Sequence, residues 1–232
     1  PPPPKTLFPY TTLFRSLDLR DRYGGTVDVI GFGPLSAEDV MKETLTYGID
    51  DAFLISDPQF ADMDVSQVAK IVAAVIKKLG PYDLVLCGRQ AIDGDSAHMA
   101  SMTSCALEIP LIAYSDEITE MKDGSVFATC MGDQMAYKVE AKTPAMILSI
   151  REKNKNRFPS VPDIMKTYDG TYKTKILTNE ELNLSVTKRK VTQLRKYEVK
   201  SSKQQKLVMS NGKDEEEKAA QILQLLKQKS VI

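Results

Sequence analysis

Short apolar runs alternate with amphipathic stretches through the first half of the chain. Residues 26–30, 51–56 and 83–87 are rich in β-branched and aliphatic side chains, which predicts three strands. Apolar residues at helical spacing predict helices over residues 36–48, 65–80 and 96–107. The order β-α-β-α-β-α predicts an α/β fold, in which a doubly wound, mostly parallel sheet carries helices on both faces.

The pattern changes near residue 122. Residues 125–130 and 134–140 flank a Met-Gly-Asp turn and predict a hairpin, and residues 145–150 predict another buried strand. These segments predict antiparallel strands added to the parallel core. From residue 188 the chain is basic and weakly patterned up to a final helix that opens with Asp214.

We therefore expect three parts. Residues 1–16 form an artefactual or disordered lead, residues 17–187 an α/β nucleotide-binding domain, and residues 188–232 a C-terminal arm with a partner-binding helix. Residues 6–16 back-translate to a common sequencing-library adapter, so we expect a truncated reading frame that resumes near Leu17 with the tail of a helix. A genuine proline-rich lead is the alternative.

Composition narrows the classes of function. Lys and Arg number 31, as do Asp and Glu, so the zero net charge gives no general reason to expect nucleic-acid binding. No apolar run approaches the ~20 residues that span a bilayer, so we expect no membrane insertion. Three dispersed cysteines predict neither a disulfide framework nor a metal site, and they favour the cytoplasm. With His98 as the one histidine, a two-histidine zinc site is excluded.

The strongest candidate site follows the strand at residues 83–87. A small-residue turn around Gly94 leads into a helix near Ser96, and such a junction offers helix N–H groups to an anion. An ordinary junction, in which Asp93 or Asp95 only caps the helix, is the alternative. We expect these aspartates to fix the turn rather than act as acid and base, and no GxxxxGK[ST] motif supports phosphoryl transfer.

The order of residues in this turn is specific. Gly-Arg-Gln-Ala-Ile-Asp-Gly-Asp, residues 88–95, closely resembles the nucleotide-binding loop of the beta subunit of electron-transfer flavoproteins. Residues 29–34, 156–166 and 225–232 resemble three further stretches of that family, in the same order. The chain departs from the family pattern at His98-Met99, at Ala100-Ser101 and at residues 167–172.

The resemblance implies a sheet of the adenine nucleotide alpha hydrolase-like type. It also implies a heterodimer in which an alpha subunit holds the redox FAD and this subunit holds AMP or a second FAD. Such a heterodimer passes electrons between dehydrogenases and a downstream acceptor, and some members bifurcate electrons from NADH. The implied cofactor-binding residues are Phe32, Gly33, Gly88, Arg89, Gln90, Ala91, Ile92, Asp93, Gly94, Asp95, Ser96, Ala97, His98 and Met99.

The resemblance also implies a loop that docks acyl-CoA dehydrogenases or similar redox partners. Its residues here are Phe158, Pro159, Val161, Pro162, Ile164 and Met165, and an ordinary packed loop is the alternative. We see no hydrolytic or transferase site, so we expect an electron-carrier subunit rather than a complete enzyme. The competing functions are a stand-alone α/β adenine-nucleotide-binding protein of stress-protein type and a structural subunit with an empty pocket.

Overall fold

The computed structural model describes residues 10–90, 97–150, 157–184 and 212–228. The chain divides into two compact units, residues 1–192 and residues 193–232. The second unit contains helix α7 (Glu215–Gln228), which has an acidic first turn and a basic last turn. The first unit contains every strand that the structure describes.

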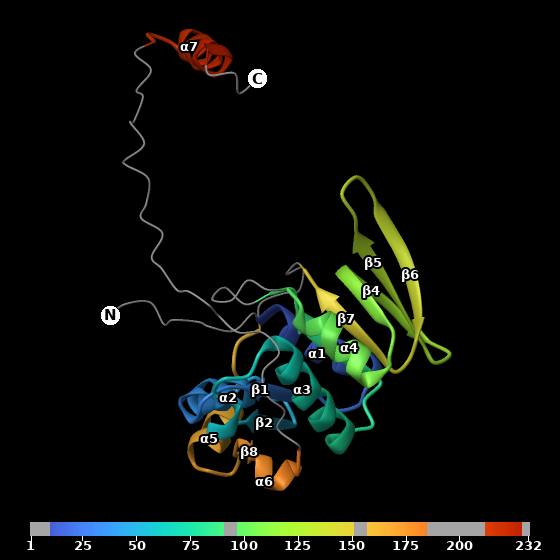
Figure 1. Ribbon diagram of the computed structural model, residues 1–232. Coiled ribbons are helices and arrows are strands. Elements are labelled where there is room, and N and C mark those ends of the chain that lie inside the picture. The colour runs from blue at the N-terminus through green and yellow to red at the C-terminus, as the bar shows by residue number, and fades with distance from the viewer. Residues whose placement is uncertain (1–9, 91–96, 151–156, 185–211, 229–232) are drawn as a thin grey trace. The chain divides into compact units, whose positions relative to one another are not determined.

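One sheet of the first unit is small and entirely parallel. Strands β1 (Asp28–Phe32), β2 (Asp51–Ile55) and β8 (Lys175–Leu177) lie in the order β1-β2-β8. Helix α2 (Glu38–Leu45) connects β1 to β2, and Met41 and Leu45 on α2 are buried against this sheet (Figure 1). Strand β2 is the most buried of the three because it is the central one.

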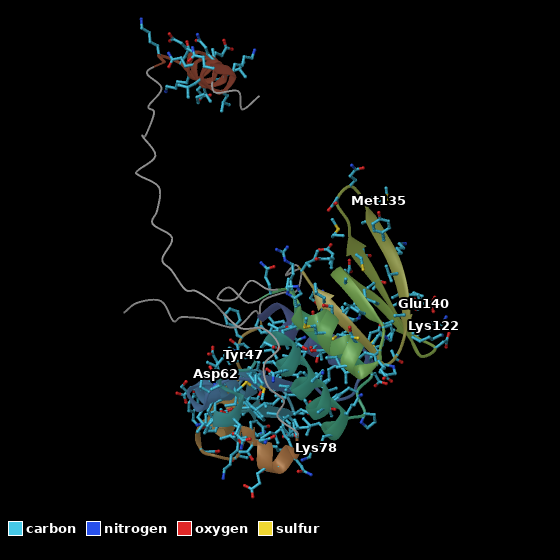
Figure 2. The ribbon with its side chains drawn as sticks, in the orientation of Figure 1. Tyr47, Asp62, Lys78, Lys122, Met135 and Glu140 are labelled. Atoms are coloured by element: carbon cyan, nitrogen blue, oxygen red, sulfur yellow. The ribbon has the colours of Figure 1, made fainter. Side chains whose placement is uncertain are left out.

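The other sheet is mixed and has the order β3-β7-β4-β5-β6. Its members are β3 (Leu84–Gly88), β4 (Leu111–Lys122), β5 (Ser125–Met131), β6 (Ala136–Lys142) and β7 (Ala145–Ser149). Strands β3, β7 and β4 are parallel, whereas β4, β5 and β6 are antiparallel. Figure 2 shows Met135 at the tip of the β5–β6 hairpin and Lys122 toward the opposite end.

Helices cover both sheets. Helix α3 (Val65–Leu79) begins with a capping box of Asp64 and Gln67, and helix α4 (Met99–Leu107) follows β3. Ala73, Ile76 and Leu107 of these two helices pack with Ile30 of β1 and Val85 of β3. The remaining described helices are α1 (Tyr10–Tyr23), α5 (Val161–Tyr168), α6 (Asn179–Leu182) and the short 3-10 turns Leu35–Ala37 and Pro58–Phe60.

The α/β class with added antiparallel strands is confirmed. One detail differs: β3 pairs with β7 rather than joining β1 and β2 in one continuous sheet. Helix α4 begins at Met99 rather than near residue 96, and β4, β8 and α6 were missed, as was α5, which lies where we expected a loop.

Helix α1 begins at Tyr10, whereas we expected the reading frame to resume near Leu17 with the tail of a helix. Leu13 is 5% exposed and Phe14 4% exposed, and both join Leu17 in the core beside β2. Residues 10–16 are thus helical, and the expectation that residues 1–16 form an artefactual or disordered lead stays a prediction.

Candidate functional site

A cavity of about 680 Å³ lies between β1 and β3, and we call it the interstrand groove. Asp28, Ile30 and Phe32 line it from β1, and Leu84, Val85, Leu86 and Cys87 line it from β3. Helix α1 contributes Leu19 and Tyr23, while α3 and α4 contribute Val72, Ile76, Met99 and Thr103. The cavity therefore runs along β1 and β3, from the residues that precede each strand to Phe32 and Cys87, and it reaches Met99 at the start of α4.

The junction between β3 and α4 carries most of the predicted cofactor residues. Arg89 and Gln90 are exposed, and Arg89 Nε donates to Gln90 Oε1 at 2.8 Å. Ala97 has a φ of 52°, in the left-handed region, directly before His98. Residues 91–96, which include Ala91, Ile92, Asp93, Gly94, Asp95 and Ser96, lie outside the described residues.

Helix α4 begins without a side-chain cap from its N-cap residue. His98 occupies that position, is exposed and makes no capping hydrogen bond with its side chain. Its carbonyl oxygen accepts from Met102 N at 3.0 Å and from Ser101 Oγ at 3.0 Å. Because the first N–H groups of a helix need external acceptors, this end of α4 suits a phosphate oxygen.

The end of β1 supplies an aromatic wall. Phe32 stacks against Phe60 with ring centroids 6.0 Å apart. Gly33 N donates to Ile55 O at 3.1 Å, which continues the pairing with β2. A Cβ at Gly33 would lie 3.6 Å from Ala37 Cβ, an ordinary contact, so these neighbours impose no need for glycine.

Two of the titratable groups that line the groove have a shifted pKa. Burial raises the pKa of the Cys87 thiol to about 12, so this thiol stays protonated near neutral pH and is a poor nucleophile. Burial, and then its hydrogen bond to Asp28, raise the pKa of the Tyr82 hydroxyl. Within the described ranges, no cluster of three or more His, Cys, Asp or Glu side chains could hold a metal ion.

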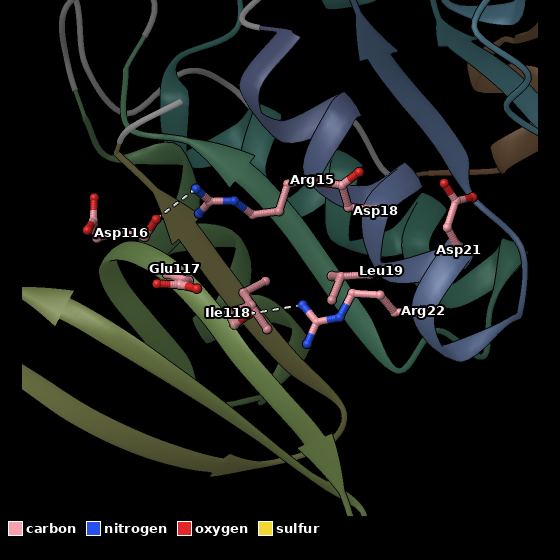
Figure 3. Close-up of a pocket in the computed structure, with 8 residues that line it drawn as sticks. All are labelled: Arg15, Asp18, Leu19, Asp21, Arg22, Asp116, Glu117 and Ile118. Carbon is pink, nitrogen blue, oxygen red and sulfur yellow. Dashed lines mark hydrogen bonds between the residues drawn. The ribbon is translucent and has the colours of Figure 1, made fainter. Parts of the chain in front are cut away.

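A second cavity, of about 460 Å³, lies between α1 and β4 (Figure 3). Arg15 is buried there and donates to Asp116 O at 2.9 Å and to Ser149 Oγ at 3.0 Å. Arg22 donates to Thr119 O at 2.9 Å. Both guanidinium groups donate hydrogen bonds to residues of β4 or β7. This cavity therefore lies where α1 is attached to the mixed sheet.

The same helix holds the start of the predicted docking segment. Arg157 Nη2 lies 2.5 Å from Asp18 Oδ1 and 2.6 Å from Asp21 Oδ2, both on α1. Ser160 then caps α5, since its Oγ accepts from Asp163 N at 3.1 Å. The segment is thus held at Arg157 and again at the helix cap.

Between and beyond these anchors, large apolar side chains face solvent. Phe158 is 88% exposed, Val161 68% and Met165 64%. Tyr168, which the sequence analysis missed, is 73% exposed and continues the stripe, because positions 161, 165 and 168 share one helix face. Pro162 is also exposed, whereas Pro159 and Ile164 are half-buried.

Comparison with known proteins decides the family. Residues 12–176 match the electron transfer flavoprotein domain. This chain belongs to the electron transfer flavoprotein family. It is 36% identical over 173 residues to the electron transfer flavoprotein subunit beta of Thermoanaerobacterium thermosaccharolyticum, a match covering 74% of this chain and 65% of that protein.

Two further relatives of this flavoprotein chain carry the names of larger complexes. The caffeyl-CoA reductase-Etf complex subunit CarD of Acetobacterium woodii is 35% identical, over 73% of this chain and 64% of its own length. The acryloyl-CoA reductase electron transfer subunit gamma of Anaerotignum propionicum is 34% identical, over 66% and 58%. The chain therefore spans less than two thirds of the length of these relatives.

The predicted cofactor-binding residues of this electron transfer flavoprotein chain that the structure describes divide into two groups. Phe32 and Met99 line the interstrand groove, whereas Gly33, Gly88, Arg89, Gln90, Ala97 and His98 lie outside that lining. The groove also contains Tyr82 and Thr103, which sequence reasoning missed because neither belongs to a motif. Among the helices that the structure describes, none has the length and apolar character needed to span a membrane.

Proposed function

We propose that this chain is the beta subunit of a heterodimeric electron-transfer flavoprotein and that it binds an adenine nucleotide where β3 leads into α4. The carrying observation is that the N-cap residue His98 gives α4 no side-chain cap, and that α4 begins beside a cavity that β1 and β3 also line. Family membership supports the electron-transfer role, and the names of the relatives support partnership with CoA-linked reductases.

The described residues fit a nucleotide in chemical type. Helix N–H groups at Met99 and Ala100 favour phosphate oxygens, and the exposed Arg89 adds positive charge nearby in the chain. Phe32 provides an aromatic surface at the other border of the groove. A bound flavin would supply the redox chemistry, while this chain's own groups bind and orient the nucleotide.

The nature of the nucleotide separates two versions of this function. AMP would have a structural role beside one redox FAD in the alpha subunit. A second FAD would allow hydride transfer from NADH and division of the electron pair. Purification of the heterodimer, followed by acid release and quantification of nucleotides, distinguishes one FAD plus one AMP from two FAD.

A charge variant at the start of α4 tests the site itself. His98→Asp and His98→Asn both place a good N-cap on an exposed position, so both are expected to fold. Only aspartate adds a negative charge where the phosphate would bind. We expect His98→Asp to bind the nucleotide at least about tenfold more weakly than His98→Asn, as measured by titration of the stripped heterodimer.

Equal nucleotide affinity of the two variants would contradict phosphate binding at the start of α4. A heterodimer that releases no adenine nucleotide would contradict the proposal as a whole. ATP hydrolysis by the chain alone, without flavin, would favour the stand-alone nucleotide-binding function instead.

We further propose that the exposed stripe of Phe158, Val161, Met165 and Tyr168 docks a redox partner of the acyl-CoA dehydrogenase type. Large exposed apolar residues on a short, anchored helix are suited to act as interface hot spots. The two anchors at Arg157 and Ser160 reduce the ordering cost of binding.

A further inference from the structure

Strand β6 is the outermost strand of the mixed sheet, and no strand among the described residues pairs with its outer side. It has seven residues, and β5 pairs with its inner side. Five of the seven are exposed, and the other two, Val139 and Ala141, are half-buried. Because β3 lies at the opposite edge of this sheet, the outer side of β6 is separate from the proposed nucleotide site.

Backbone hydrogen bonds near its two ends show which groups of β6 point outward. Gly132 N donates to Met135 O at 2.9 Å, and Thr143 N donates to Gly124 O at 3.0 Å. In an antiparallel pair, residues that exchange hydrogen bonds alternate with residues that do not. The odd-numbered residues of β6 therefore bond to β5, and the even-numbered residues direct their N–H and C=O groups outward. The outward-facing residues are Ala136, Lys138, Glu140 and Lys142.

The charges on this edge have a particular order. Lys138 and Glu140 are both exposed and lie on either side of Val139. Charged side chains on an edge strand normally discourage pairing with another strand. A strand with the reverse order of charges would instead place each of them opposite a charge of the other sign. The same strand running in the opposite direction has that order.

An antiparallel second copy of β6 fits over the whole strand. Val139 is the middle residue of the seven, so a twofold axis between two Val139 residues pairs every residue of β6. Lys138 of each copy then lies opposite Glu140 of the other, and this pair can exchange two backbone hydrogen bonds because both residues face outward. An axis between two neighbouring residues would place outward-facing groups opposite inward-facing ones and make no ladder.

Other registers with the correct hydrogen-bond phase are less favourable. An axis at Lys138 or at Glu140 places two like charges directly opposite each other, which destabilises strand pairing. An axis at Ala141 brings opposite charges together but pairs only residues 140–142 of the strand. The sequence of β6 therefore favours the register centred on Val139.

The odd-numbered side chains are also complementary in this register. Tyr137 is 52% exposed and lies opposite the small Ala141 of the second copy, while the two Val139 side chains meet at the axis. These are non-hydrogen-bonded pairs, in which side chains approach most closely. Val139 and Ala141 already pack against the buried cluster of the mixed sheet, so pairing extends that apolar surface.

We infer that the outer edge of β6 binds a second copy of this chain, in the antiparallel register centred on Val139. Pairing joins the mixed sheets of the two copies edge to edge. Lys138 of each copy contacts Glu140 of the other through the backbone and through the side chain. The same surface is used by both copies, so the assembly closes at two chains.

Charge-reversal variants of the full-length chain test this inference by analytical ultracentrifugation. We expect Lys138→Glu and Glu140→Lys each to raise the dimer dissociation constant at least about fivefold, because like charges then lie opposite each other at two places. An equimolar mixture of the two variants should recover the wild-type constant, since one chain is then acidic at both positions and the other is basic. Lys122→Glu, an exposed reversal on β4 away from this edge, should dimerise as the wild type does.

Amide hydrogen exchange locates the paired edge. The outward-facing amides of Lys138 and Glu140 should exchange at least about tenfold more slowly in the dimer than in the diluted chain. The amide of Val139, which bonds to β5 in either state, should change far less. Protection of Lys138 and Glu140 that does not depend on chain concentration would show that the chain covers its own edge, and would contradict the inference.

Further results would also overturn it. These are a chain that stays monomeric at every concentration, and a dimer that both single variants form as tightly as the wild type. Failure of the mixed variants to recover the wild-type constant would show that Lys138 and Glu140 do not pair across the axis. In the co-expressed heterodimer, protection of these two amides in a complex with one copy of this chain would assign the edge to the other subunit.

Discussion

Tyr82 forms a hydrogen bond between segments that belong to different sheets. Its hydroxyl donates to Asp28 Oδ2 at 2.6 Å, so a residue two positions before β3 is joined to the first residue of β1. Burial of the phenol, and then this bond, raise the pKa of Tyr82 above its ordinary value near 10. The protonated form is therefore the one that stabilises the fold.

The sign of the pH dependence follows from that shift. A raised folded-state pKa gives stability that is present below about pH 10 and is lost as pH rises through the folded-state value. We expect Tyr82→Phe to lower the free energy of unfolding by about 1 kcal/mol at pH 8, and this deficit should shrink above pH 10. Urea denaturation from pH 8 to pH 10.5 measures both.

Tyr137→Phe is the matched control, because Tyr137 lies on the exposed strand β6 and is 52% exposed. The free energy of unfolding of Tyr137→Phe should differ from that of the wild type by close to zero at pH 8. A Tyr82→Phe deficit that is constant with pH would show that the hydroxyl does not titrate differently in the folded state.

Residues of this kind could not be found from sequence. Tyr82 and Asp28 are 54 positions apart, and Thr103 gives no local signal that its hydroxyl lies in a groove. Motif residues are different, since a strand ending near Gly88 and a helix after it could be predicted from the order of residues, although α4 begins at Met99 rather than near residue 96. The identity of a partner across sheets depends on tertiary packing, which a local pattern does not encode.

Among the elements, continuous apolar runs were predicted well. Strands β2 and β7 lie within one residue of the expected bounds, because buried parallel strands are apolar along their whole length. Strand β4 was missed because register shifts between Ser115 and Glu117, and between Ile118 and Glu120, interrupt its alternation. Strand β8 has three residues, too few for a period to be recognised.

Helix α5 gives a prediction at the scale of one element. Val161→Asp places a carboxylate in the first turn of α5, where it suits the helix dipole and should preserve the fold. It also removes an apolar side chain from the proposed docking stripe. We expect the Kd of the heterodimer for an acyl-CoA dehydrogenase to rise at least tenfold, as measured by calorimetry.

Leu35→Asp is the control for that substitution. Leu35 is 60% exposed and also begins a helical turn, but it lies outside the docking segment. This variant should bind the dehydrogenase as wild type does, and both variants should retain their nucleotide. Equal weakening by the two substitutions would mean that the effect is not specific to α5.

In the first unit as a whole, the interstrand groove lies between two clusters of buried hydrophobic side chains. Ile55 packs with Phe60, Ile71 and Val75 beside the parallel sheet, whereas Ile147 packs with strands of the mixed sheet. Helices α3 and α4 connect them through the packing of Ile30 and Val85. No strand pairing among the described residues joins the two sheets, so their local stabilities should be separable.

A matched pair of core substitutions tests this separation. Ile55 and Ile147 are both fully buried, and Ile→Val at either site should cost about 1 kcal/mol. We expect Ile55→Val to speed hydrogen exchange in β1 and β2 about fivefold with little change in β5 and β7, and Ile147→Val to do the reverse. Equal acceleration of both sheets by either variant would show one cooperative unit.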